Sequence, residues 1–163
     1  MKTALSLLVL IFLSVNAYAQ TPVINSVDVT DYGIYAATRH EDQASGQGIG
    51  HGIETDERLI AMIRTVPMQL GVHFGFHYTV VGAPAGAMVP LRMVTYFPSP
   101  GLRNPKASQP ILRNEYTRNT AIGRPEYHDY SFDNPWELVP GTWTMEIWYG
   151  DRKLLSQSFT VAK

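Results

Sequence analysis

The segment 136–161 constrains the fold of this chain more than any other part of the sequence. Large apolar side chains occupy every second position after the Pro140-Gly141 pair, and a second such run follows the polar turn at 150–153. A period of two with aromatic and β-branched residues predicts strands with one buried face. Gln157 shares the inward phase, so we expect it to need a hydrogen-bond partner or a place near the sheet edge. The predicted β-hairpin has these side chains inward: Trp143, Met145, Ile147, Tyr149, Leu155, Phe159 and Val161.

The first 19 residues are expected to be a cleaved signal peptide. Lys2 precedes an apolar run at 5–15, and Ala17-Tyr18-Ala19 fits the small-x-small cleavage rule. The run has about 11 residues, fewer than the ~20 that a membrane-spanning helix needs. Cleavage after Ala19 leaves 163 − 19 = 144 residues. We therefore expect a periplasmic or secreted protein.

The mature part, 20–163, has the size of a single domain with a real core. It contains no cysteine, so packing alone must hold it. Without Lys2 it has 13 − 1 = 12 basic and 14 acidic residues, a net charge of −2. This balance gives no general argument for nucleic acid or membrane surfaces as partners, and no later segment is apolar enough to cross a bilayer. Composition does not determine the oligomeric state.

Four stretches before the hairpin are clear predicted strands, and three earlier regions need more argument. The alternation at 23–37 changes phase near Asp31 and Gly33, which predicts a β-bulge or a strand that crosses between sheets. The glycine-rich stretch 38–52 is predicted to be a loop. The next stretch, 53–66, fits a helix or a strand, and the all-β surroundings favour a strand. The clearer strands are 72–80, 89–97, 111–122, which is polar enough for an edge, and 127–132.

Short strands separated by glycine and proline turns predict an all-β fold, an antiparallel β-sandwich of seven to eight strands. Several stretches also resemble a family of bacterial exported proteins of unknown function. They are the signal peptide, VDVTDYGIY, IRTVPMQLGVHFGF, TYFPSPGL and, most specifically, FDNPWELVPGTWTMEIWYGDRKLLSQSFTV. The resemblance implies an immunoglobulin-like sandwich and transfers no catalytic residues.

Motifs for catalysis or metal binding are weak. His73 and His77 share a strand face but lie roughly 13 Å apart at ~3.3 Å per residue, too far to bind one zinc ion. No nucleophile elbow of the G-x-S-x-G type is present. We therefore expect no catalytic residues, no metal and no cofactor. The alternative is a hydrolase or metal-dependent enzyme with its site in the loops at 38–57, where these side chains gather: His40, Glu41, Asp42, His51, Glu54, Asp56 and Glu57.

Charge is segregated along the chain. Five of the six charged residues at 103–124 are basic, on or near the predicted edge strand. Such charges protect an edge against pairing with other chains, and we favour this reading over contact with an anionic envelope component. A further alternative is a structural module whose edge strand adds to a partner's sheet.

Aromatic residues suggest the binding site. Trp148 is out of phase with the core face of its strand, so we expect it on the opposite side of the sheet, with Glu146 as a neighbour that accepts a hydrogen bond from the same ligand. Coverage of Trp148 by the loop at 98–110 is the competing interpretation. The favoured function is a non-enzymatic exported module that binds an envelope protein or glycan through these residues: Trp148, Glu146, Tyr127, Tyr130 and Trp136, with Tyr116 nearby.

Overall fold

The computed structural model describes the backbone of residues 20–44 and 50–163, and the side chains of these residues except those at 37–56. The predicted signal peptide and most of the glycine-rich GQGIGHG stretch lie outside the described residues. Nine strands and one 3₁₀ turn are described: β1 (Val23–Ala44), β2 (Gly50–Ala61), β3 (Thr65–Pro67), β4 (His73–Ala83), β5 (Met88–Tyr96), β6 (Arg113–Ala121), β7 (Pro125–Ser131), η1 (Pro135–Glu137), β8 (Gly141–Tyr149) and β9 (Arg152–Ala162).

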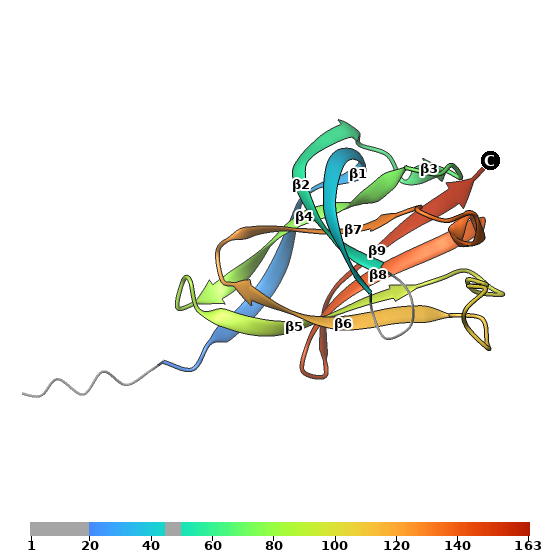
Figure 1. The fold of residues 1–163 in the computed structure, drawn as a ribbon. Helices are drawn as coiled ribbons and strands as arrows, with labels where there is room; N and C mark the ends of the chain where they lie inside the picture. Colours follow the sequence, from blue (N-terminus) through green and yellow to red (C-terminus); the bar gives the residue numbers. More distant parts are fainter. Residues whose placement is uncertain (1–19, 45–49) are drawn as a thin grey trace, which may run out of the picture.

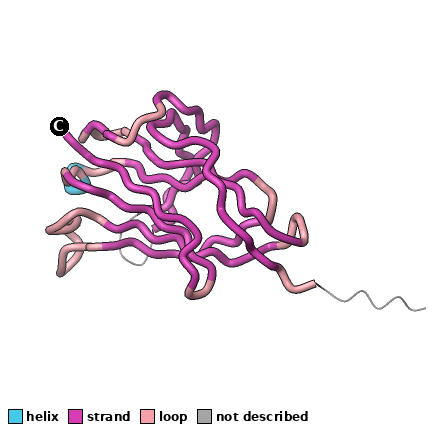
Figure 2. The backbone as a smooth tube through the Cα atoms, turned by 180° about the vertical axis from the view of Figure 1, so that it is seen from behind, coloured by secondary structure: helices cyan, strands magenta, loops and turns pink. Residues whose placement is uncertain are grey.

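The strands form two sheets that pack face to face (Figure 1). One sheet has the order β2-β1-β4-β7 and the other β3-β9-β8-β5-β6. The short β3 pairs in parallel with β9, and the other described pairings are antiparallel. Figure 2 shows strand along most of the backbone and a single helical turn, η1. The chain is therefore an all-β sandwich, with nine strands rather than the seven to eight predicted.

The closing hairpin forms a wall of the core, as its period of two predicts. Trp143, Met145 and Ile147 of β8 are fully buried, as are Phe159 and Val161 of β9 to within 1%. Gln157 is also buried. With its amide turned so that the oxygen faces Arg64, that oxygen accepts from the guanidinium at 2.5 and 3.2 Å. The expected hydrogen-bond partner is therefore present.

The facing wall is β4, whose inward side chains are fully buried: Phe74, Phe76, Tyr78 and Val80. Aromatic rings meet across the two layers. The Phe74 ring centroid lies 5.8 Å from that of Trp143 and 5.3 Å from that of Phe159, both in edge-to-face geometry. Ring pairs of this kind stabilise a core beyond the area they bury.

The prediction of a loop at 38–52 was wrong for the residues that the structure describes, 38–44 and 50–52. β1 continues to Ala44 and pairs with β2, which begins at Gly50, so the connection is short. Three register shifts interrupt the β1–β2 pairing between Ile34 and Asp42, and beyond them the pairing is regular from Asp42–Gly52 to Ala44–Gly50. The segment 53–66 is strand rather than helix in β2 and β3, as favoured.

The predicted phase change in β1 is also present. Its register against β4 shifts between Val29 and Asp31. Gly33 follows with a φ of 140°, and a Cβ atom there would lie 2.0 Å from the Ala61 carbonyl oxygen. Glycine is needed at this point because β2 crosses too close to the backbone for any side chain.

β6 is an edge strand, as predicted, and the region 98–110 is a loop with one isolated bridge between Leu102 and Ile111. Within the described residues, no helix has the length and apolarity needed to cross a bilayer.

Three arginines connect the two sheets. Arg152 of β9 donates to the Ile24 carbonyl of β1, and Arg118 of β6 donates to the Tyr127 carbonyl of β7. Arg64, which contacts Gln157 of β9, also lies over the ring of Tyr32 in β1, 4.2 Å from its centroid. Guanidinium groups thus connect the two sheets both on the side of β6 and β7 and on the side of β1 and β9.

Candidate functional site

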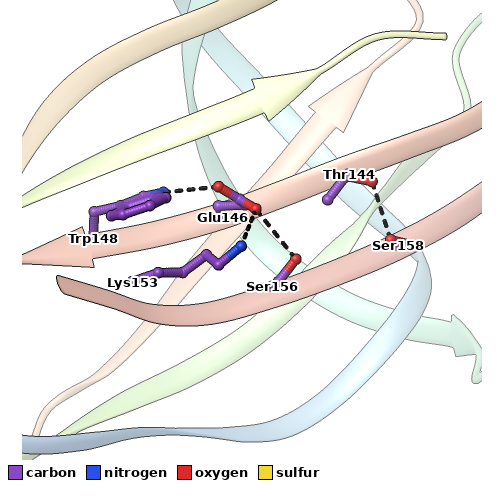
Figure 3. Close-up of polar contacts among 6 residues, drawn as sticks. All are labelled: Thr144, Glu146, Trp148, Lys153, Ser156 and Ser158. Carbon is purple, nitrogen blue, oxygen red and sulfur yellow. Dashed lines mark hydrogen bonds and ion pairs between the residues drawn. The ribbon is translucent and has the colours of Figure 1, made fainter. Parts of the chain in front are cut away.

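The outer face of the five-stranded sheet carries Trp148 and Glu146, two of the residues of the predicted binding site. Because Trp143, Met145 and Ile147 point into the core, Glu146 and Trp148 must point outward. Figure 3 shows these two side chains with Lys153 and Ser156 of the neighbouring strand.

Strand register arranges the outward side chains in three rows. Trp148 lies between Arg92 of β5 and Lys153 of β9. The other rows are Val94, Glu146 and Ser156, and then Tyr96, Thr144 and Ser158. We call these nine residues the outer-face rows.

A bulge in β9 determines what stands beside Trp148. Ile147 pairs with Leu155, but Trp148 pairs with Lys153, so Leu154 is the extra residue. A regular register would have placed Leu154 opposite Trp148. Bulges commonly redirect a side chain next to functional sites. Here the bulge exchanges an apolar neighbour of the indole for a cation.

Glu146 is the centre of the hydrogen-bond network. Its carboxylate accepts from Trp148 Nε1 at 2.8 Å, from Lys153 Nζ at 2.9 Å and from Ser156 Oγ at 3.4 Å. The residue is only 7% exposed, and a buried charge needs partners of this kind. The network fixes the orientation of the indole on a rigid strand.

Trp148 is half-buried, and two cations lie over its ring. The distance to the ring centroid is 4.7 Å for Arg92 Cζ and 5.5 Å for Lys153 Nζ. β5 pairs with β8 from Arg92, opposite Trp148, to Tyr96, opposite Thr144. The loop at 98–110 follows Tyr96, at the end of this pairing away from Trp148. Arg92 and Lys153, rather than this loop, therefore flank Trp148. The expectation that Glu146 and the indole N–H both meet a ligand needs correction, because they bond to each other.

The other predicted aromatic residues lie elsewhere. Tyr130 faces the core, with its ring centroid 4.9 Å from that of Trp143 and its hydroxyl donating to Glu137. Trp136 packs beside the core in η1. Tyr127 is buried on the outer side of the four-stranded sheet, because it alternates with the inward Tyr130 and His128. Tyr127 and Tyr130 are thus covered, and the five predicted residues do not form one surface.

A second polar cluster surrounds Tyr127. Asp31 accepts from the Tyr35 hydroxyl at 2.5 Å and lies 2.7 Å from His77 Nδ1. Burial raises the pKa of Asp31, but the hydrogen bonds from Tyr35 and His77 outweigh it and hold the pKa below its ordinary value. Burial, together with Asp31, raises the pKa of Tyr35. The arrangement ties the bulge of β1 to β4.

The proposed enzyme site in the loops at 38–57 lies outside the described side chains except for Glu57. Elsewhere among the side chains that the structure describes, no three His, Asp or Glu residues come close enough to hold a metal ion. His73 and His77 accordingly do not belong to such a group.

Sequence patterns did not identify Arg92 and Lys153. Each is an unremarkable charged residue in its own strand, and its place beside Trp148 depends on pairing between strands and on the bulge. One available signal was alternation in 91–95, where Arg92 separates the inward Leu91 and Met93 and must point outward.

Comparison with known proteins places the chain in a family. No curated protein matches it. Its fold is similar to the crystal structure of an immunoglobulin-like protein from Pseudomonas aeruginosa, at 25% identity and a TM-score of 0.60, covering 88% of this chain and 98% of the other. The family model described as "Domain of unknown function (DUF3859)" matches residues 24–161. The chain, an immunoglobulin-like β-sandwich, therefore belongs to the DUF3859 family, whose function is unknown.

Proposed function

We propose that this chain is an exported, non-enzymatic module that binds a component of the bacterial envelope through the outer-face rows. The observation that carries the proposal is the indole of Trp148, which is partly exposed and is held in place by Glu146 at 2.8 Å. A rigid aromatic ring loses little conformational entropy on binding and offers a broad apolar surface.

The composition of this face favours a glycan over a protein. Ser156 and Ser158 are exposed, and the Thr144 and Ser158 hydroxyls lie 3.0 Å apart. Hydroxyl groups both donate and accept, as sugar hydroxyls do. The exposed large apolar side chains that the structure describes lie outside the outer-face rows. A protein interface generally has an apolar core, which this face does not offer.

Export is part of the same proposal, because the expected ligand lies outside the cytoplasm. It rests on the apolar run at 5–15 and the Ala17-Tyr18-Ala19 sequence. The non-enzymatic role is supported by the chemistry of the outer-face rows, where the one carboxylate that could act as a base, Glu146, is occupied by three donors.

Binding to purified bacterial sacculi tests the proposal. The protein is expressed from its full sequence, purified after export, and sedimented with sacculi or with extracted envelope proteins. Trp148→Ala should lose sedimentation with sacculi while it keeps its thermal midpoint to within a few degrees. Trp136→Ala removes the same kind of side chain from η1, outside the outer-face rows, and serves as the matched control.

Two results would contradict the proposal. One is sedimentation that is equal for wild type and Trp148→Ala. The other is binding to extracted envelope proteins and not to sacculi, which would favour a protein partner.

A further inference from the structure

Arg92 has hydrogen-bonding capacity that the fold does not use. Its guanidinium stacks over Trp148 and makes no hydrogen bond to any group that the structure describes. The ion pair to Glu115 is loose, with Nη1 and Oε2 3.6 Å apart, and the side chain is 35% exposed. The N–H groups of a guanidinium lie in its own plane, where they match the two oxygens of a carboxylate.

The second cation is placed beside it by the β9 bulge. Lys153 Nζ donates to Glu146, and its side chain remains 46% exposed. An ammonium has three donors, so it can keep this contact and still meet a ligand. Arg92 and Lys153 thus reach the same indole from opposite neighbouring strands.

The local charge balance has an excess of one positive charge. Arg92, Arg113 and Lys153 oppose Glu115 and Glu146, which gives 3 − 2 = +1. The carboxylate bonded to the indole, Glu146, is buried, whereas the two cations over the ring, Arg92 and Lys153, have side chains that are 35% and 46% exposed. A ligand approaching Trp148 therefore meets cations first.

We propose that Arg92, Lys153 and Trp148 form an anion subsite, and that the glycan bound by this face is acidic. A sugar carboxylate would bind the Arg92 edge and Lys153, and its ring would lie against the exposed part of the indole. The serine and threonine rows would meet the hydroxyls of the following sugars. This inference rests on the proposed function and adds the chemical class of the ligand.

A matched pair of ligands tests it. Galacturonic acid oligomers carry one carboxylate per sugar, and their methyl esters have the same skeleton without the charge. Binding is measured by calorimetry and by Trp148 emission, with the protein produced from its full sequence. We expect the ester to bind about tenfold or more weakly than the acid, and the affinity for the acid to fall as salt rises.

Substitutions locate the subsite. Arg92→Gln and Lys153→Gln should each weaken binding of the acid about tenfold and leave the ester unaffected. Arg92→Lys keeps the charge but loses the planar fork, so it should not restore full affinity. Arg113→Gln is the matched control, because it removes a cation from the same face. Arg113 lies near Glu115, as Arg92 does, but it is not one of the two cations over the Trp148 ring. Thermal unfolding verifies that each variant folds.

Three outcomes would overturn the inference. Equal affinity for acid and ester would remove the anion subsite. Equal losses in Arg92→Gln and Arg113→Gln would show diffuse attraction instead of a defined site. Binding to vesicles with anionic lipid, without binding to the oligomers, would assign the cations to a membrane surface. If sacculi still depend on Trp148 while the acid gives no advantage, the proposed function stands and only the ligand class is wrong.

Discussion

Replacing Trp143 by alanine tests the packing of the closing hairpin most directly. The side chain is fully buried, and its ring centroid lies 4.9 Å from those of Phe97 and Tyr130 and 5.4 Å from that of Phe132. Its indole N–H donates to the Val139 carbonyl at 3.0 Å. Truncation therefore removes apolar contacts on several sides and leaves one carbonyl without its donor.

The expected loss follows from these contacts. Deleting a buried tryptophan costs about 3–5 kcal/mol, and the upper half of that range applies where surrounding rings cannot collapse into the space. A domain is stable by roughly 5–15 kcal/mol in total, so the variant should fold but unfold at much lower urea. Thr144→Ala, one residue along on the other face, should cost well under about 1 kcal/mol, since among the described residues its hydroxyl bonds to the exposed Ser158.

Equilibrium urea unfolding, followed by far-ultraviolet circular dichroism, measures both variants. The dependence of the unfolding free energy on urea should keep its slope, because the surface exposed on unfolding hardly changes. Equal losses for Trp143→Ala and Thr144→Ala would refute the assignment of inward and outward faces, and with it the outward position of Trp148.

Three further predictions concern other parts of the molecule. The lowered pKa of Asp31 means that its contribution to stability is present above the ordinary value of 3.8 and is lost as pH falls through the lower folded value. Asp31→Asn should therefore lose less stability than wild type as pH falls from about 5 to about 2, and equal losses of unfolding free energy in urea for the two proteins would disprove this. Glu146→Ala frees the indole N–H of Trp148, so the emission of Trp148 should shift to the red. This emission is the difference between the spectra with and without the further change Trp148→Phe, measured in wild type and in Glu146→Ala. An unchanged difference spectrum would exclude a positioning role for the carboxylate. N-terminal sequencing of the exported protein should begin at Gln20, and a cytoplasmic product that retains Met1 would contradict export.

The sequence predicted what depends on neighbours along the chain. The period of two determined which side chains of β4 and β8 face the core, because alternation is a property of a single strand. The same reasoning placed Trp148 outward. It also indicated that Gln157 needs a partner, although not that Arg64 would supply one.

What the sequence could not predict depends on pairing. The exposure of Tyr127 and Tyr130 was misjudged because neighbouring strands and η1 cover them. Tyr130 packs against Trp143 of the facing sheet and bonds to Glu137 of η1, whereas Tyr127 packs against Tyr35 and His77 of its own sheet. Lys153 joins Trp148 only through a bulge that no local pattern marks. The glycine-containing start of β2 was taken for a loop because local composition does not reveal that Gly50 and Gly52 pair with β1.

The arginine bridges between the sheets have a consequence for where this fold can persist. Many immunoglobulin domains join their two layers by a disulfide, which exists only under oxidising conditions. Here Arg152, Arg118 and Arg64 span the layers by contacts with carbonyl groups, an amide and an aromatic ring. A guanidinium stays protonated far above physiological pH, so these ties respond neither to thiols nor to moderate acidity. The connection between the layers is therefore independent of redox potential, and the domain should be equally stable with or without reductant.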